Sequence, residues 1–225
     1  MANASITFQR SGNISTCTLT GMHPQILTIS QTKILPLIKL FSRSYFLVGG
    51  TAIALQIGHR RSIDFDLFRN GTIDHKKIAD ILRKKRMKYE LIFKNEDGYH
   101  CRIDEVKLTF FSFPNSMAHP VKFDGYISMP GLLDLGAMEA FAFSRRGKWK
   151  DYVDMYFLLR DHYSFREIAT RAEELFSPEF SSKLFRTQLS YFGDIDYSET
   201  IEYVTTAPTD SEIKSFLSKA ATEPF

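Results

Sequence analysis

The chain has 225 residues, of which 44% are hydrophobic and 24% are charged, and its formal net charge at pH 7 is +3. Its two cysteines, Cys17 and Cys101, are too few and too distant for a disulfide framework or a zinc site. No apolar run approaches the roughly 18 residues of a membrane span, and the N-terminus lacks the pattern of a secretory signal. We therefore expect a globular cytoplasmic protein with one sizeable core and no membrane partner.

In chain order, the patterns predict a loose arm, a part that mixes helices and strands, and a helical part. Residues 1–21 are rich in Ser, Thr, Asn and Gly, which is typical of an arm or of two weak strands. Within residues 22–130 we expect helices at 30–42 and 74–88, a short helix from 51, and strands at 45–48, 62–68, 89–94, 99–104, 106–113 and 121–129. Residues 131–225 follow with helices at 131–144, 148–160, 164–176, 181–192 and 210–221. The expected fold class is α+β, a mixed sheet with flanking helices followed by a helical C-terminal region.

The run YFLVGGTAIALQIGHRRSIDFDLF, residues 45–68, is the most informative part of the chain. A short apolar strand ends at Gly49-Gly50, where the backbone must turn, and Thr51 suits the N-cap of a short helix that stops near Gly58. A Gly-Gly-Thr sequence after a strand is most often a simple turn. Its meaning here depends on the strand that follows.

Asp64 and Asp66 alternate with Ile63, Phe65 and Leu67 in that second strand. Because side chains repeat every two residues along a strand, both carboxylates point the same way, roughly 6.5 Å apart. An Asp-x-Asp pair is common on solvated strands, but acids inside a strongly apolar strand usually need a metal, a partner or water. Two such carboxylates can hold the Mg²⁺ ions that serve phosphoryl displacement.

The residues VGGTAIALQIGHRRSIDFDLF resemble the first motif of the AbiEii/AbiGii class of abortive-infection nucleotidyltransferases, the toxins of type IV toxin–antitoxin pairs. The similarity extends from about Met22 through LLDLGAMEAFAFSRRGKWKDYVDMYFLL to Leu159. This class belongs to the DNA polymerase β-like superfamily. The resemblance therefore implies a polymerase β-like core at 22–130, and a nucleoside triphosphate as substrate, with Mg²⁺ or Mn²⁺ as cofactor. It also implies an RNA acceptor such as tRNA, and a cognate antitoxin as partner.

The resemblance assigns roles to individual residues. Gly49, Gly50 and Thr51 would hold the triphosphate, and Asp64 and Asp66 would bind the metal and act in catalysis. The rest of the nucleotide pocket would come from Lys150, Asp151 and Asp154, with Asp154 also catalytic. Without the resemblance, the simpler interpretation of Lys150 and Asp154 is an exposed ion pair within one helix. Further candidates for phosphate contacts are Ser62 and either Arg60 or Arg61.

Two positions depart from the pattern of this class. A third carboxylate usually lies on the strand beside Asp-x-Asp, and the matching residue here is Thr109. The lysine of the class before its Arg-Gly loop is replaced by Glu139, for which we consider two hypotheses: a substitute metal ligand, or a surface glutamate near Arg145 or Arg146. These departures keep a second function open, a catalytically silent module that binds a nucleotide or a protein. A phosphotransferase or an aminoglycoside-type adenylyltransferase also stays open, because the fold does not determine the acceptor.

Two basic segments, residues 83–86 and 145–150, have the composition of sites that grip a nucleic-acid backbone, and Trp149 offers a ring for base stacking. The simpler interpretation is a solvated helix face for the first segment and a packing role for Trp149.

Overall fold

The computed structural model describes residues 21–143, 145 and 147–222. The expected N-terminal arm, with its two weak strands and Cys17, lies outside this range except for Gly21. No helix in the described ranges has the length and apolar character that crossing a bilayer requires.

A five-stranded mixed sheet forms the first half of the fold, in the order β1-β2-β5-β4-β3. The strands are β1 (Phe46–Val48), β2 (Phe65–Asn70), β3 (Glu90–Lys94), β4 (Gly98–Ile103) and β5 (Val106–Phe113). Strands β2 and β5 run parallel, and the other neighbours run antiparallel. The expected extended piece at 121–129 is instead a separate hairpin, β6 (Val121–Phe123) and β7 (Ile127–Met129), because Gly125 adopts a positive φ of 68° between them.

The helices of this half are α1 (Ile29–Ile38), α2 (Gly49–Ile57) and α3 (His75–Lys84), with 3₁₀ turns η1 (Pro24–Ile26) and η2 (Lys39–Phe41). The helix expected at 30–42 ends as an α-helix at Ile38 and tightens into η2. Pro36 accounts for this change, because it lies inside α1 and has no N–H to donate to the preceding turn. At its start α1 has a capping box made by Thr28 and Gln31.

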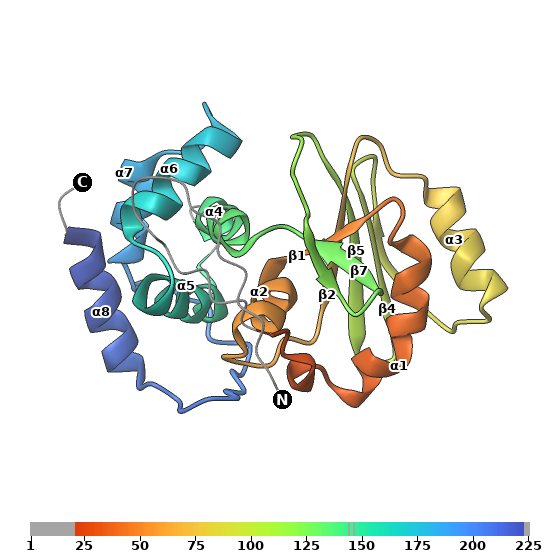
Figure 1. Ribbon diagram of the computed structural model, residues 1–225, viewed down its shortest axis with the longest axis horizontal. Coiled ribbons are helices and arrows are strands. Elements are labelled where there is room, and N and C mark those ends of the chain that lie inside the picture. The colour runs from red at the N-terminus through yellow and green to blue at the C-terminus, as the bar shows by residue number, and fades with distance from the viewer. Residues whose placement is uncertain (1–20, 144, 146, 223–225) are drawn as a thin grey trace, which may run out of the picture.

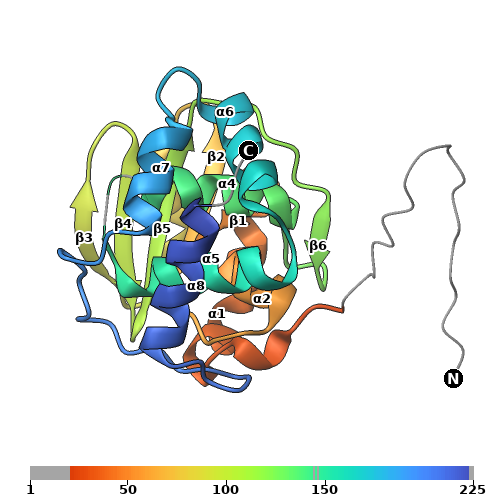
Figure 2. The same cartoon turned by 90° about the vertical axis from the view of Figure 1, so that its left-hand side faces the viewer.

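Only helices follow residue 131 in the described part of the chain (Figure 1). They are α4 (Leu132–Phe143), α5 (Trp149–Asp161), α6 (Phe165–Phe176), α7 (Ser182–Leu189) and α8 (Asp210–Thr222). The capping box expected from Ser164 and Glu167 begins α6 as predicted. In Figure 2, which views the molecule from the helical side, α8 lies over α5. The sheet followed by helices confirms the expected α+β architecture.

Helices α2 and α5 connect the two halves. Helix α2 packs on α4 and α5 as well as on β1 and β2. Helix α5 is buried along most of its length, with Tyr152, Val153 and Leu158 fully inaccessible to solvent. Because α5 is buried on almost every side, its polar residues near the start are held at fixed positions. That placement creates the cleft described next.

Candidate functional site

A cleft of about 660 Å³ opens between the sheet and the helical part. It is lined by the loop before β2, the β4–β5 turn, the start of α5 and the loop before α8. Its residues are Gly50, Arg60, Ser62, Ile63, Asp64, Asp66, Arg102, Asp104, Glu105, Lys107, Lys148, Lys150, Asp151, Asp154 and Glu199. Eight of the site residues expected from the sequence therefore meet here, whereas Gly49, Thr51 and Glu139 are not among the lining residues.

Asp64 and Asp66 both line the cleft, but only Asp66 belongs to β2; the strand expected at 62–68 begins later, and Asp64 lies in the loop before it. The strand begins at Phe65, and Phe65 and Leu67 are fully buried on the opposite face. Ile63 does not share that apolar face; its side chain is 53% exposed, because it precedes the strand. Burial and the charge of Asp66 both raise the pKa of Asp64. A divalent cation would relieve that repulsion, and carboxylates are the hard oxygen ligands that Mg²⁺ and Mn²⁺ prefer.

Gly49 and Gly50 leave space for the side chains of Asp66 and Arg60. Gly49 has φ +70°, and a Cβ on it would lie 2.7 Å from Oδ2 of Asp66. A Cβ on Gly50 would lie 2.6 Å from Nη2 of Arg60. Glycine is required at both positions because a carboxylate and a guanidinium group press against the backbone of the turn.

Thr51 does not cap the helix, contrary to the expectation from the sequence. Helix α2 begins two residues earlier, with Val48 at the N-cap position. The buried Thr51 hydroxyl lies 2.9 Å from Oγ of Ser62 and hydrogen-bonds to the main-chain carbonyl of Asp64. Thr51 therefore fixes the loop that carries the acids, and it does so from behind the cleft wall. Gly58, in contrast, ends α2 with a left-handed φ of 69° as expected.

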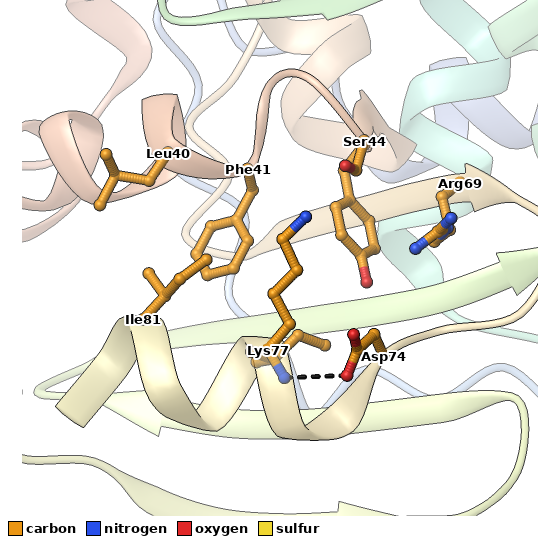
Figure 3. A pocket seen from close by; sticks show the side chains of 9 residues that line it. Leu40, Phe41, Ser44, Arg69, Asp74, Lys77 and Ile81 are labelled. Atoms are coloured by element: carbon orange, nitrogen blue, oxygen red, sulfur yellow. Dashed lines mark hydrogen bonds between the residues drawn. The ribbon is translucent and has the colours of Figure 1, made fainter. Parts of the chain in front are cut away.

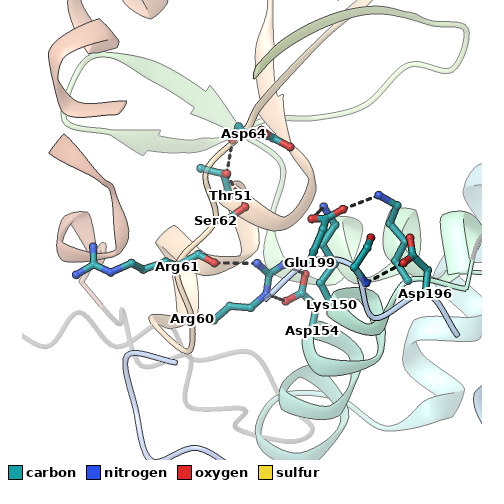
Figure 4. A network of polar contacts seen from close by, with 11 residues as sticks. Thr51, Arg60, Arg61, Ser62, Asp64, Lys150, Asp154, Asp196 and Glu199 are labelled. Atoms are coloured by element: carbon teal, nitrogen blue, oxygen red, sulfur yellow. Dashed lines mark hydrogen bonds and ion pairs between the residues drawn. The ribbon is translucent and has the colours of Figure 1, made fainter. Parts of the chain in front are cut away.

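Arg60, His59 and Asp154 form a buried polar cluster at the back of the cleft, and Figure 4 shows Arg60 against Asp154. Arg60 donates from Nε and Nη2 to the two oxygens of Asp154, each at 2.6 Å, and Nε2 of His59 lies 2.7 Å from Oδ1. The three side chains are at most 4% exposed. Burial would raise the pKa of Asp154, but the charge of Arg60 and the contact with His59 hold it below its usual value. Burial lowers the pKa of His59 and the charge of Arg60 adds to that effect, although the contact with Asp154 acts in the opposite direction.

This cluster overturns the interpretation of Lys150 and Asp154 as an exposed pair within one helix. Asp154 is 1% exposed and pairs with Arg60, while Lys150 pairs with Glu199 at 2.5 Å. Arg61, the alternative to Arg60, is bonded to Glu202 away from the lining of the cleft. Asp151 is almost completely buried. The roles that the resemblance assigns to Lys150, Asp151 and Asp154 stay predictions.

Glu199 and Lys148 are cleft residues that the sequence analysis did not select. Glu199 accepts a hydrogen bond of 2.5 Å from Nζ of each lysine, Lys148 and Lys150 (Figure 4). Arg102 and Lys107 add two further cations to the lining. A single glutamate in a polar loop has no periodicity or motif, so no sequence signal could have placed Glu199 here. Lys148 precedes the Trp-Lys-Asp run of α5 and was considered only as part of a basic segment.

Thr109 is the neighbour of Asp66 across the parallel pair β2–β5, as inferred from the sequence. Glu139 on α4 is 4% exposed, so the surface-glutamate hypothesis for it is wrong. Burial acts to lower the pKa of Arg60, but the charge of Asp154, with a smaller contribution from Glu139, raises it. Among the described residues, no group of three or more His, Cys, Asp and Glu side chains is placed to hold a metal ion. An ion at Asp64 and Asp66 would therefore need oxygen atoms from water or from the phosphates that it accompanies.

The structure gives little support to Trp149 and the two basic segments as nucleic-acid contacts. Trp149 is 5% exposed and packs against Tyr152, so it is a packing residue and not a free stacking surface. Arg145 lies over the ring of Phe141, and Arg146 lies outside the described residues. The basic end of α3 does not line the cleft.

A second hollow lies between η2, β2 and α3 (Figure 3). The side chain of Lys77 and the ring of Phe41 line it, and its volume is about 10 Å³. That is room for roughly one water molecule. The large cleft at Asp64 and Asp66 is therefore the better candidate for a substrate site.

No family model matches the chain. An uncharacterized protein of Aquifex aeolicus is 32% identical over 123 residues, which are 52% of this chain and 59% of that protein. The chain thus spans about three fifths of the length of the curated relative that it matches.

Two solved structures show the fold. MenT4, a nucleotidyltransferase toxin from Mycobacterium tuberculosis, superposes with a TM-score of 0.57 at 11% identity, covering 85% of this chain and 81% of MenT4. A proposed nucleotidyltransferase from Helicobacter pylori superposes with a TM-score of 0.53 at 13% identity, covering 84% of this chain and 91% of that one. The five-stranded sheet, its helices and the helical C-terminal part therefore form a nucleotidyltransferase fold.

Proposed function

We propose that the protein is a nucleotidyltransferase that moves a nucleotide from a nucleoside triphosphate to an acceptor hydroxyl. The observation that carries the proposal is the composition of the cleft. Two adjacent carboxylates, Asp64 and Asp66, lie on one wall, and the cations Lys148 and Lys150 lie on another. One wall suits a divalent metal and the other suits phosphate oxygens.

In the proposed reaction, the acceptor oxygen attacks the α-phosphorus, a new P–O bond forms, and the bond to the β-phosphate breaks to release pyrophosphate. Mg²⁺ or Mn²⁺, when bound by Asp64 and Asp66, would supply charge neutralisation for this displacement. Gly50 lets the turn approach the ligand, and Arg60 with Asp154 fixes the back wall. The proton of the acceptor hydroxyl passes to water, because Thr109 cannot take it, and we therefore expect slow turnover.

Within this proposal the acceptor is RNA, with tRNA as the first candidate, and the protein acts in the cytoplasm as the toxin of a toxin–antitoxin or phage-defence pair. The support is the resemblance of residues 48–68 to the AbiEii/AbiGii class, together with a fold neighbour that is a nucleotidyltransferase toxin. A cognate antitoxin would be the protein partner.

The test is transfer of label from each α-³²P-labelled nucleoside triphosphate to total RNA with Mg²⁺ or Mn²⁺. The intact protein should label one RNA class, and the Asp64→Asn/Asp66→Asn variant should label none. The Arg61→Gln variant is the matched control, because Arg61 is bonded to Glu202 away from the cleft lining and should leave labelling unchanged. Equal labelling by the intact protein and the double variant would overturn the proposal.

A catalytically silent nucleotide-binding module is the second candidate. The specific observation in its favour is Thr109, which takes the position beside Asp66 where the class carries a third acid. This function predicts binding of a metal–triphosphate complex in calorimetry with no transfer in the labelling assay.

A further inference from the structure

Glu199 places a negative charge on the wall of the cleft that carries Lys148 and Lys150. Its carboxylate is bonded at 2.5 Å to both Lys148 and Lys150, one lysine on each oxygen. The three side chains are partly open to solvent, with Lys150 21% and Glu199 41% exposed. Two lysines on one carboxylate is a geometry that equally suits a phosphate group, which offers more oxygens and more charge.

The loop that carries Glu199 crosses from one wall of the cleft to the other. Here we call residues 196–204 the strap. At one end, the N–H of Asp196 donates to the carbonyl of Gly147, and its carbonyl accepts from Trp149. At the other end, the N–H of Arg61 donates to the carbonyl of Glu202, and Val204 donates to the carbonyl of His59. Both ends are thus fastened by main-chain hydrogen bonds.

Side chains add to this attachment. Tyr197 packs 5.2 Å from the ring of Trp149, measured between centroids, and Nζ of Lys214 lies 5.5 Å from the Tyr197 ring. The strap therefore holds Glu199 in one place, and the glutamate side chain can leave the lysines by rotation while the main chain stays attached.

The charges in the cleft point to what replaces Glu199. Glu199 lines the same cleft as Asp64 and Asp66, so the three acids share one space. Each lysine of this wall already pairs with Glu199, so a phosphate group that binds there replaces that carboxylate. A polyphosphate bound with a divalent cation would satisfy both walls, with the cation at the aspartates and the phosphates at the lysines.

We propose that Lys148 and Lys150 bind the outer phosphates of the triphosphate, and that Glu199 is an internal competitor that those phosphates displace. The inference rests on the proposed function for the identity of the site and deepens it by assigning the phosphate subsite and its occupant. Ligands whose phosphates reach the lysines compete with Glu199. Nucleoside monophosphates, which lack the outer phosphates, do not.

The experiment is calorimetric titration of the full chain with inorganic tripolyphosphate in Mg²⁺. Glu199→Gln keeps the shape of the side chain and removes its charge, so the affinity for tripolyphosphate should rise about tenfold, as expected for two partly exposed ion pairs. Glu202→Gln is the matched control: it alters a neighbouring glutamate of the strap that pairs with Arg61, and its affinity should equal that of the unaltered protein. Lys150→Met should weaken binding about tenfold.

An unchanged affinity in Glu199→Gln, or a rise of equal size in Glu202→Gln, would overturn the inference, and so would the absence of tripolyphosphate binding in every variant. Glu199→Asp is a second variant, which keeps the charge on a shorter side chain. Its affinity for tripolyphosphate should lie between those of the unaltered protein and of Glu199→Gln. Thermal melting of each variant reports folding. This titration requires no nucleotide transfer, so it is independent of the labelling assay. If labelling fails but Glu199→Gln binds tripolyphosphate more tightly, the proposed reaction is rejected and the phosphate subsite is kept.

Discussion

Arg60 and Asp154 are joined by two parallel hydrogen bonds of 2.6 Å although 94 residues separate them in the sequence. Arg60 belongs to the loop before β2, and Asp154 belongs to α5. The pair therefore connects the sheet wall of the cleft to its helical wall. A buried pair of this kind is costly to break, because the remaining partner keeps an uncompensated charge away from water.

Arg60→Met should lower the free energy of unfolding by about 3–5 kcal/mol, since it leaves the Asp154 carboxylate buried beside His59. Urea unfolding followed by circular dichroism measures the loss. The control is Arg61→Met, which removes a largely exposed pair with Glu202 and should cost less than about 1 kcal/mol. Similar losses in the two variants would show that the buried pair does not hold the walls together.

Stability should fall as the pH drops below about 6.5, in part because of His59. Burial lowers the pKa of His59 in the folded protein, so the unfolded chain takes up the proton first. The contribution of His59 to the free energy of unfolding is complete above the histidine pKa of the unfolded chain. It is lost as the pH falls toward the lower pKa of His59 in the folded protein, by at most about 1.4 kcal/mol per pH unit. His59→Gln should flatten the curve between pH 5 and roughly 7. The difference between the two urea-unfolding curves isolates His59, because every other histidine is common to both proteins. Parallel curves would contradict the prediction.

Gly49→Ala should weaken metal binding as well as the fold. The substitution at a φ of +70° costs about 1–2 kcal/mol from the backbone alone, and its Cβ would also push against Asp66. Gly125→Ala is the matched control, because Gly125 has a φ of +68° with nothing within 4 Å of an added Cβ. The rise in melting temperature on adding Mn²⁺ should be reduced in Gly49→Ala and unchanged in Gly125→Ala. A reduction of equal size in both would assign the effect to general destabilisation.

Thr109→Asp should create the missing third carboxylate beside Asp66. Thr109 is 8% exposed, so without metal we expect a loss of about 1–3 kcal/mol from a further negative charge in a buried place. Added Mn²⁺ should then raise the melting temperature of Thr109→Asp more than that of Thr109→Asn, which has the same shape without the charge. Equal metal-induced shifts in the two variants would show that position 109 does not face the ion.

Local patterns determined several elements correctly for physical reasons. The alternation of Phe65, Asp66 and Leu67 buries the two apolar side chains on one face and leaves Asp66 on the other, because a strand repeats every two residues. The capping box at Ser164 begins α6 because it satisfies main-chain N–H groups within one turn. Local rules failed where Pro36 tightened a helix and where Gly125 turned an expected extended piece into a hairpin, since each depends on a backbone detail of one or two residues.

The sequence by itself determined the acid pair, the glycine turn and most of the order of helices and strands, and the resemblance to a known class placed Thr109 beside Asp66. Only the tertiary structure decided which charges meet across the cleft: Arg60 with Asp154, and Glu199 with Lys148 and Lys150. The reason is that the hydrogen bonds of a helix and the side-chain alternation of a strand are set by residues a few positions apart. A pair between distant segments depends instead on how the buried apolar faces of α2, α5 and the sheet pack together.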